Sequence, residues 1–348
     1  LIGFLIGMIL SPLLNDRFGR KGRFISSIAC AIAFQSIILF LQEFPPSSKR
    51  GEASYTSDVV FSFFCFAGMT LGTNELLGTN LPLLTAMQIL LCVISVLVTV
   101  RLHESPKFLL LKRNDELELR KVLGLMRLID DGIQEGRDDT SSATSLNDVR
   151  IILNDVVLRK TLLLGLAALQ SIVPLWTILF NSTDLLLDLK ATKFIAQWTS
   201  SGMVVCYFIG TIIGSILIDR VGRRILYIPC SAISTICIAA ITAAFYLKSI
   251  FHHAEYIAVT AMLLNFLVFG VGIASIAWFV TSELTPQRYR CLMQSMVAVI
   301  NTVEAAVFTF AVMPLYRAFG AWVFLVLFCL ISSVCIVFLY FELPETKG

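Results

Sequence analysis

Long apolar runs separated by polar loops constrain the fold of this chain more than any other feature. About ten runs can be marked: Leu1–Leu14, Phe24–Leu41, Val59–Leu77, Pro82–Val100, Thr161–Phe180, Phe194–Ile218, Ile225–Leu247, Ala258–Val280, Leu292–Met313 and Ala321–Phe341. A run of 18 or more apolar residues is long enough to cross the hydrocarbon core of a bilayer, which is about 30 Å thick. Only 15% of residues are charged, against about 25% in soluble domains. We therefore predict an all-α integral membrane protein.

The sequence offers no chemistry for an enzyme. The nine cysteines and three histidines show no metal-ligand spacing, and most cysteines lie inside apolar runs, where they serve as small packing residues. No nucleotide-binding glycine pattern and no nucleophile elbow occurs. We expect no enzymatic activity, no metal and no cofactor. The expected partners are a small-molecule solute and the lipid bilayer, and not nucleic acid.

One long polar stretch, Leu102–Lys160, divides the runs into four before it and six after it. Its charged helical pattern indicates a cytoplasmic loop with short helices, so three parts are predicted: an incomplete transmembrane bundle over 1–102, the loop over 103–160 and a six-helix bundle over 161–348. With the C-terminus cytoplasmic, the positive-inside rule holds except at the front of the chain. Only four basic residues fall outside after that front part: Lys190, Lys193, Lys248 and Arg317. We expect a plasma-membrane protein.

Two short motifs each occur twice. A D-R-x-G-R-[KR] loop spans 16–21 and again 219–224, and an E-x-x-P-x-x-x-R segment spans 43–50 and again 283–290. The glycine of the first motif permits a tight reversal between helices. Such doubled motifs are typical of transporters built from two related halves. Two further tags are H-E-S-P-K-F-L at 103–109 and P-E-T-K-G at 344–348.

Together these motifs resemble the sugar porters of the major facilitator superfamily, which include the facilitative glucose transporters. The resemblance implies a twelve-span fold in which two bundles rock around a central solute site, and it implies transport of a small polar, sugar-like solute. It also implies that the motif charges form cytoplasmic ion pairs that latch one state, although they could merely orient loops. The charges concerned are Asp16, Arg17, Arg20, Glu43, Arg50, Asp219, Arg220, Arg223, Glu283 and Arg290.

Against this family pattern the front of the chain departs from the expected order. About 10 of 12 spans are present, and the chain begins within the second. Only one run separates the loop at 16–23 from the segment at 43–51, which the family places on the same side of the membrane. We expect that a segment of roughly one span is missing here.

The expected solute-binding positions are also altered. By resemblance, Gln170, Trp278 and Asn301 keep family residues, whereas Asp58 stands where the family has a glutamine and Tyr207 where it has an asparagine. Glu304 lies one helical turn after Asn301 inside an apolar run. A carboxyl group in the membrane is costly and often functional. Glu304 could bind a proton or a cationic solute, or it could simply pair with a neighbouring hydroxyl or amide.

Three functions follow from these patterns. The first is transport of a small polar, sugar-like solute by alternating access, with Gln170, Trp278, Asn301, Glu304 and Asp58 in the solute site. The second is an organic-ion or proton-coupled carrier of a related family, which the altered site and Glu304 favour. The third is a non-transporting sensor or a defective fragment, which the missing spans favour.

Overall fold

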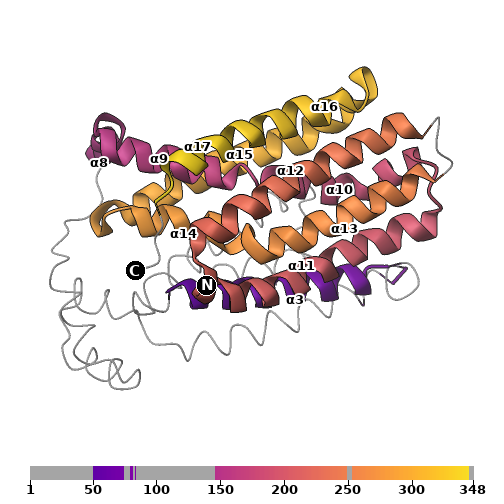
Figure 1. Cartoon of the computed structure of the whole chain (residues 1–348), viewed down its shortest axis with the longest axis horizontal. Helices are drawn as coiled ribbons and strands as arrows, with labels where there is room; N and C mark the ends of the chain where they lie inside the picture. The colour runs from indigo at the N-terminus through magenta and orange to yellow at the C-terminus, as the bar shows by residue number, and fades with distance from the viewer. Residues whose placement is uncertain (1–49, 74–78, 81–82, 84–145, 249–252, 345–348) are drawn as a thin grey trace, which may run out of the picture. The chain divides into compact units, whose positions relative to one another are not determined.

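The computed structural model describes residues 50–73, 79–80, 83, 146–248 and 253–344, and these residues fold as α-helices joined by short turns (Figure 1). Their bounds are α3 Arg50–Leu71, α8 Leu146–Asn154, α9 Val156–Leu169, α10 Val173–Asp188, α11 Lys193–Val221, α12 Arg223–Leu247, α13 Ala254–Gly272, α14 Ala274–Leu284, α15 Gln287–Phe319, α16 Trp322–Phe324, the π-helix η3 Leu325–Leu330 and α17 Ile331–Glu342. No strand occurs within these ranges.

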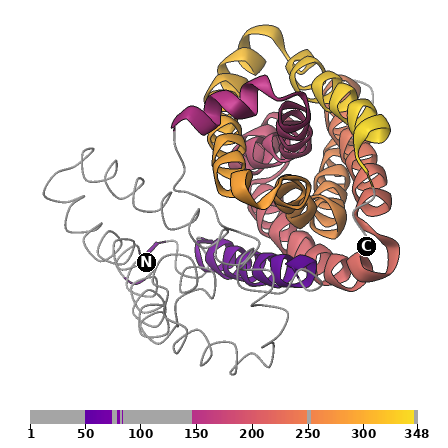
Figure 2. The same ribbon diagram turned by 90° about the vertical axis from the view of Figure 1, so that its left-hand side faces the viewer.

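Six helical stretches in this part of the chain are long and apolar enough to cross a membrane. They are Val156–Asp188, Lys193–Ile218, Arg223–Leu247, Ala254–Leu284, Leu292–Phe319 and Trp322–Glu342. This confirms the six spans predicted after the long polar stretch, and Figure 2 shows them end-on as one bundle. Several helices extend beyond the predicted runs, because hydropathy marks only the apolar part of a helix that continues into polar flanks.

Two of these spans are interrupted, whereas the hydropathy pattern predicts continuous helices. The first span changes from α9 to α10 across residues 170–172, and Pro174 lies in the first turn of α10. Proline lacks the N–H of a helical hydrogen bond, so it suits the first turn of a new helix. The fourth span changes from α13 to α14 at Ile273, directly after Gly272. Both interruptions lie well inside the membrane spans.

Glycines bring α11 and α13 into backbone contact. A Cβ atom at Gly210 would lie 3.1 Å from the Cα of Gly270, and one at Gly214 would lie 3.0 Å from the Gly270 carbonyl oxygen. Neither position therefore has room for a larger residue. Small residues four apart allow this close approach between membrane helices, where packing rather than hydrophobicity drives association. The contact makes α11 and α13 a tightly joined pair.

Helix α3 packs against the same group of helices. Residues 51–70 form one compact unit with 143–348. Ser62 Oγ and Thr211 Oγ1 of α11 lie 3.0 Å apart, and the rings of Phe63 and Phe208 are 5.8 Å apart. The first predicted run with described residues, Val59–Leu77, thus belongs to a helix that begins at Arg50. The predicted domain boundaries at 102 and 160 stay a prediction.

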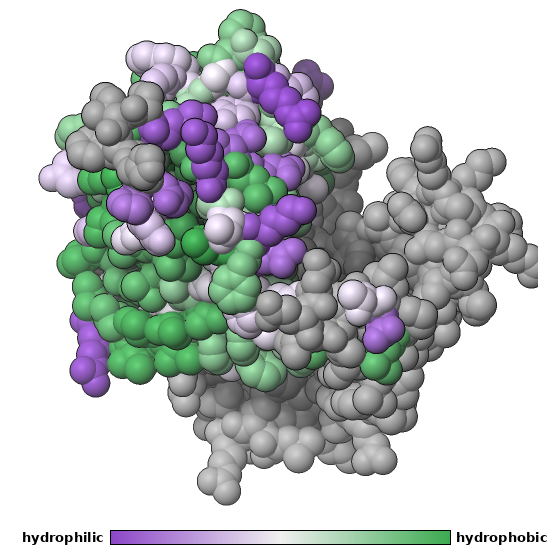
Figure 3. All heavy atoms as spheres, turned by 90° about the vertical axis from the view of Figure 1, so that its right-hand side faces the viewer, coloured by the Kyte–Doolittle hydropathy of each residue, from purple (hydrophilic) through white to green (hydrophobic). Residues whose placement is uncertain are grey.

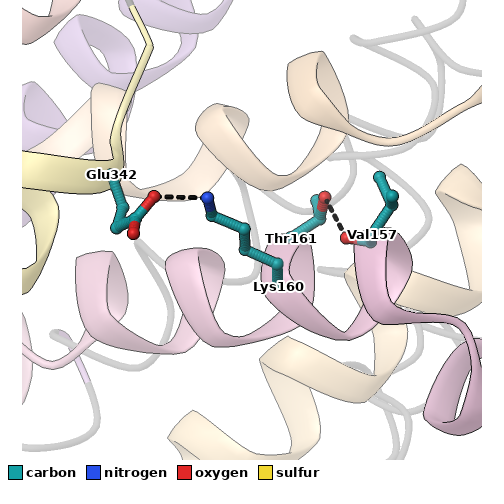
Figure 4. Close-up of polar contacts among 4 residues, drawn as sticks. All are labelled: Val157, Lys160, Thr161 and Glu342. Atoms are coloured by element: carbon teal, nitrogen blue, oxygen red, sulfur yellow. Dashed lines mark hydrogen bonds and ion pairs between the residues drawn. The ribbon is translucent and has the colours of Figure 1, made fainter.

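The first and last spans of the bundle are joined at one end. Lys160 near the start of α9 forms an ion pair with Glu342, the last residue of α17, while Thr161 Oγ1 donates to the Val157 carbonyl at 3.1 Å (Figure 4). Asp155 caps α9 by accepting from the N–H of Val157 at 2.8 Å. The ion pair joins the start of α9 to the end of α17, and the Asp155 cap marks the first turn of α9.

The opposite end carries the turns α10–α11 and α12–α13. Hydrophilic side chains gather on this end, and apolar side chains cover its flank (Figure 3). Behind the turns, the rings of Phe245, Tyr316 and Phe324 pack together, with centroids of Phe245 and Tyr316 5.4 Å apart and those of Tyr316 and Phe324 5.7 Å apart. Aromatic contacts therefore join α12, α15 and α16 at this end.

Candidate functional site

Side chains from other spans form hydrogen bonds with backbone carbonyls at the interruption between α9 and α10. Tyr227 of α12 donates its hydroxyl to the Ala168 carbonyl at 2.8 Å, and Asn301 of α15 donates Nδ2 to the Leu169 carbonyl at 3.1 Å. Ser171 Oγ lies 2.9 Å from the Tyr227 hydroxyl oxygen. The same two carbonyls also accept from the backbone N–H groups of Ser171 and Ile172, at 3.4 and 2.9 Å, so the side chains add second hydrogen bonds where a membrane interior offers little water. These contacts therefore attach α12 and α15 to the residues just before the break.

Asn301 was expected to contact the solute, and the structure places it on the end of α9. It is 5% exposed, and its Nδ2 is engaged by the Leu169 carbonyl. Tyr227 and Ser171 support the same break and were missed by the sequence analysis. Pro174, which marks the break, was the signal available for finding them.

Gln170 lies in the break itself and is 4% exposed. Its side chain interacts electrostatically with the half-buried carboxylate of Glu304, while its Nε2 makes no hydrogen bond of normal geometry among the described residues. Cys335 of α17 also lies within electrostatic range of Glu304. The structure thus brings Gln170, Asn301 and Glu304 together at one break. A buried amide and a carboxylate there could bind the hydroxyl groups of a polar solute.

Asp58 belongs to a second polar group at the other interrupted span. Ser275, in the first turn of α14, donates its hydroxyl to Asp58 Oδ2. Tyr55 donates its hydroxyl to the Val271 carbonyl at 3.1 Å, and both Tyr55 and the buried Tyr207 lie within electrostatic range of Asp58. Helices α3, α11 and α14 therefore each contribute a polar side chain. The sequence predicted Asp58, but its partner Ser275 was not expected.

Trp278 lies in α14, one turn after Ser275, and is half-buried. Its backbone carbonyl accepts from Nε2 of Gln294, a fully buried residue of α15 that sequence reasoning missed. Helix α14 also packs closely on α9, because a Cβ at Gly165 would lie 3.2 Å from the Cβ of Thr281. The span with Trp278 and Ser275 thus adjoins the span with Gln170.

At the other candidate region, two of the motif charges form an ion pair. Gly222 alone separates α11 from α12 and has φ 98°, a conformation that favours glycine. Directly after it, Arg223 Nη2 lies 3.5 Å from Oε1 of Glu283, with the two side chains only 14% and 18% exposed. Each partner comes from a different one of the doubled motifs. Low exposure makes this pair stronger than a surface pair.

Of the other predicted latch residues, two have side chains that the structure describes. Arg220 is exposed at the end of α11, and Arg290 is half-buried in α15. Four others lie outside the described residues: Asp16, Arg17, Arg20 and Glu43. The side chains of Arg50 and Asp219 also lie outside them. The role of these charges as a latch stays a prediction.

Comparison with known proteins identifies the family. Residues 3–348 match the family described as "Sugar (and other) transporter". The chain belongs to this family of transporters. Facilitated glucose transporter member 3 of the dog, Canis lupus familiaris, is 23% identical over 340 residues, which cover 94% of this chain and 67% of the relative. Member 1 from the chicken, Gallus gallus, is 22% identical over 336 residues, with 94% and 68% covered.

Solved structures show the same fold. The proton:xylose symporter XylE bound to 6-bromo-6-deoxy-D-glucose aligns with a TM-score of 0.73 at 17% identity, covering 100% of this chain and 85% of the other. The outward conformation of the transporter FucP aligns with a TM-score of 0.58 at 13% identity, covering 99% and 83%. The fold is therefore the all-α helical bundle of the major facilitator superfamily. This sugar transporter family member is a multi-pass integral membrane protein that moves a small solute by alternating access, and it is not an enzyme.

Proposed function

We propose that this transporter carries a small, polar, sugar-like solute, and that the solute binds at the two interrupted spans. The observation that carries the proposal is the buried Gln170 in the α9–α10 break, whose side chain interacts with the half-buried Glu304 and whose Nε2 makes no hydrogen bond of normal geometry among the described residues. Discontinuous membrane helices commonly form solute sites near the middle of the bilayer. An amide can both donate to and accept from a hydroxyl group.

The named relatives support the choice of a sugar-like solute. Several are called facilitated glucose transporters, and one structural neighbour is a symporter of xylose. We assign Gln170, Glu304, Asp58 and Trp278 to the solute site. Asn301 belongs to the same region, where its bond to Leu169 shapes the break.

The proposal includes a cytoplasmic latch centred on Arg223 and Glu283. In alternating access, one state must close the cytoplasmic side while the other opens it. An ion pair between the start of α12 and the end of α14 can stabilise one of these states. We further propose that this end of the bundle is cytoplasmic, because basic residues concentrate on this side, and that the lipid bilayer is the plasma membrane.

A direct test is uptake by liposomes that contain the purified 348-residue chain. Radiolabelled D-glucose and D-xylose should enter faster than L-glucose, which has the same composition but the opposite handedness. Gln170→Ala should lower D-glucose uptake by about tenfold or more, because a lost buried hydrogen bond costs about 1–3 kcal/mol. Thr302→Val, at an exposed position of α15, is the matched control. Equal entry of D- and L-glucose would overturn the proposal.

Glu304 favours a second candidate function, that of a proton-coupled or organic-ion carrier. Its half-buried carboxylate lies inside the span Leu292–Phe319, where ionisable groups often form proton or ion pathways. The same liposomes distinguish this function, because uptake would then depend on a pH gradient or would require a charged solute.

A further inference from the structure

Asp58 is a carboxylate of α3 whose hydrogen-bond partner, Ser275, lies in the middle of another membrane span. Helix α3 is apolar from Tyr55 to Leu71, and Asp58 lies eight residues after its first residue, Arg50, which is about 12 Å along the helix axis. Its contact Ser275 lies nine residues before the end of α14 at Leu284, or about 14 Å. Asp58 itself lies three residues after Tyr55, where the apolar part of α3 begins, whereas Ser275 is far from either end of the span Ala254–Leu284 and draws the carboxylate to that depth. A charge at such depth is costly and has to be compensated.

The groups around Asp58 are oxygen atoms rather than cations. The hydroxyl of Ser275 donates to it, and the hydroxyls of Tyr55 and Tyr207 lie within electrostatic range. Tyr55 directs its proton to the Val271 carbonyl at 3.1 Å. Among the described residues, the nearby cation is Arg223, which acts on Tyr55 and pairs with Glu283. No basic side chain of the described ranges pairs with Asp58.

The start of helix α14, close to Asp58, favours the ionised form of the carboxylate. Helix α14 begins at Ala274, so Ser275 belongs to its first turn. The first N–H groups of a helix carry a partial positive charge that favours an anion beside them. The Ser275 hydroxyl adds a donor at the same place. These groups orient the negative charge of Asp58 without neutralising it.

We propose that Asp58, with the oxygens of Ser275 and Tyr207, forms a subsite for one positive charge that travels with the solute. The inference rests on the proposed function, and it adds that the solute is transported together with one positive charge. Within the described part of the chain, a neutral sugar alone would supply no counter-charge to this half-buried carboxylate, which is unfavourable. The positive charge is either an ammonium group on the solute or a monovalent cation bound beside it.

A matched pair of probes tests the charge directly. Glucosamine differs from glucose by one ammonium group in place of one hydroxyl when its amine is protonated in mildly acidic buffer. Binding of both probes is measured by isothermal titration on the purified full chain, and their uptake is measured in liposomes together with the transported charge. The variants are Asp58→Asn, which removes the charge with little change in shape, and Asp184→Asn, which removes an exposed carboxylate from α10.

Two results support the inference. If the charge belongs to the solute, the wild type binds glucosamine about tenfold more tightly than glucose, and D58N loses this preference while D184N keeps it. If a co-bound cation supplies the charge, both probes bind alike, but glucose uptake carries positive current that D58N abolishes. Repeating that measurement with and without sodium, and at two proton gradients, identifies the cation.

Other results overturn it. The subsite is ruled out if the wild type and D58N both bind the two probes equally and both take up glucose without current. Sugar transport itself would remain supported by that result. Failure of the wild type to bind either probe removes the proposed function, and the inference with it. Should D58N not fold, Ser275→Ala serves instead, since it keeps the carboxylate but removes its donor. An unchanged preference or current in S275A would then count against the subsite.

Discussion

Arg223, the first residue of α12, lies 3.5 Å from Glu283, the second-last residue of α14. The two side chains are 14% and 18% exposed, so water screens their attraction less than that of a surface pair. The pair links two spans of the bundle at the end where Gly222 turns the chain.

Glu283→Gln should destabilise the state in which this pair forms. The neutral amide loses the ionic attraction to the largely buried guanidinium group of Arg223. We expect the apparent affinity for solute added outside to fall about fivefold or more, measured by uptake in liposomes. The double variant Arg223→Glu with Glu283→Arg should recover part of that affinity.

The exposed pair between Lys160 and Glu342 provides the control. Its side chains are 52% and 40% exposed, and such pairs contribute only about 0–1 kcal/mol. Lys160→Gln should therefore leave the outside affinity nearly unchanged. An equal fall in K160Q and E283Q would mean that general loss of charge, and not the latch, is responsible.

Gly214→Leu should disrupt the contact between α11 and α13. A Cβ at Gly214 would lie 2.7 Å from a ring carbon of Tyr55 and 3.0 Å from the Gly270 carbonyl oxygen, and overpacking typically costs about 1–3 kcal/mol. The melting temperature in detergent should fall by several degrees. Gly68→Ala is the control, because no described atom lies within 4 Å of the added Cβ. Equal melting temperatures for both variants would contradict the close contact.

Asn301→Ala should weaken both the fold and the solute site. It removes the 3.1 Å hydrogen bond to the Leu169 carbonyl, which keeps, among the described residues, only the backbone N–H of Ile172, at a cost of about 0.5–1.5 kcal/mol. We expect a lower melting temperature together with reduced D-glucose binding. Thr302→Val, one residue further along α15, should change neither measurement, since that residue is exposed. Reduced binding at an unchanged melting temperature would instead assign Asn301 to direct solute contact.

Glu304→Gln tests the proton role of the second carboxylate. The amide keeps the size of the side chain beside Gln170 but cannot change its charge. If Glu304 carries a coupling proton, uptake by E304Q should no longer depend on external pH, whereas Asp184→Asn should retain the wild-type profile. A wild-type pH profile in E304Q would show that Glu304 only pairs with its neighbours.

The spans after the long polar stretch were predictable because each is a long apolar run, and membrane insertion depends directly on that property. From the doubled motifs, Arg223 and Glu283 were among the charges expected to form ion pairs with one another, and the observed pair is consistent with that expectation. The helix breaks were harder to predict. Hydropathy does not report where a helix is interrupted, although Pro174 and Gly272 mark the two places.

The partners within the candidate site could not be predicted from spacing. Asp58 and Ser275 are 217 residues apart in the chain, and Asn301 and Leu169 are 132 apart. Such contacts depend on which faces of the helices meet, and hydropathy in a membrane helix carries little information about that. For the same reason, the bond from the Asn301 amide to the backbone of α9 was not expected, and the contact of Asn301 with the solute stays a prediction.

The ion pair between Lys160 and Glu342 has a consequence for how the six-span unit can be rearranged. An even number of crossings returns the chain to the side where it started, and this pair brings the two ends of the unit together. Arg224 reinforces the junction by donating to the Tyr340 carbonyl at 2.5 Å. A unit whose ends adjoin can be circularly permuted, with a short linker between residues 342 and 156 and new termini in the turn at Lys190, without moving any helix from its place.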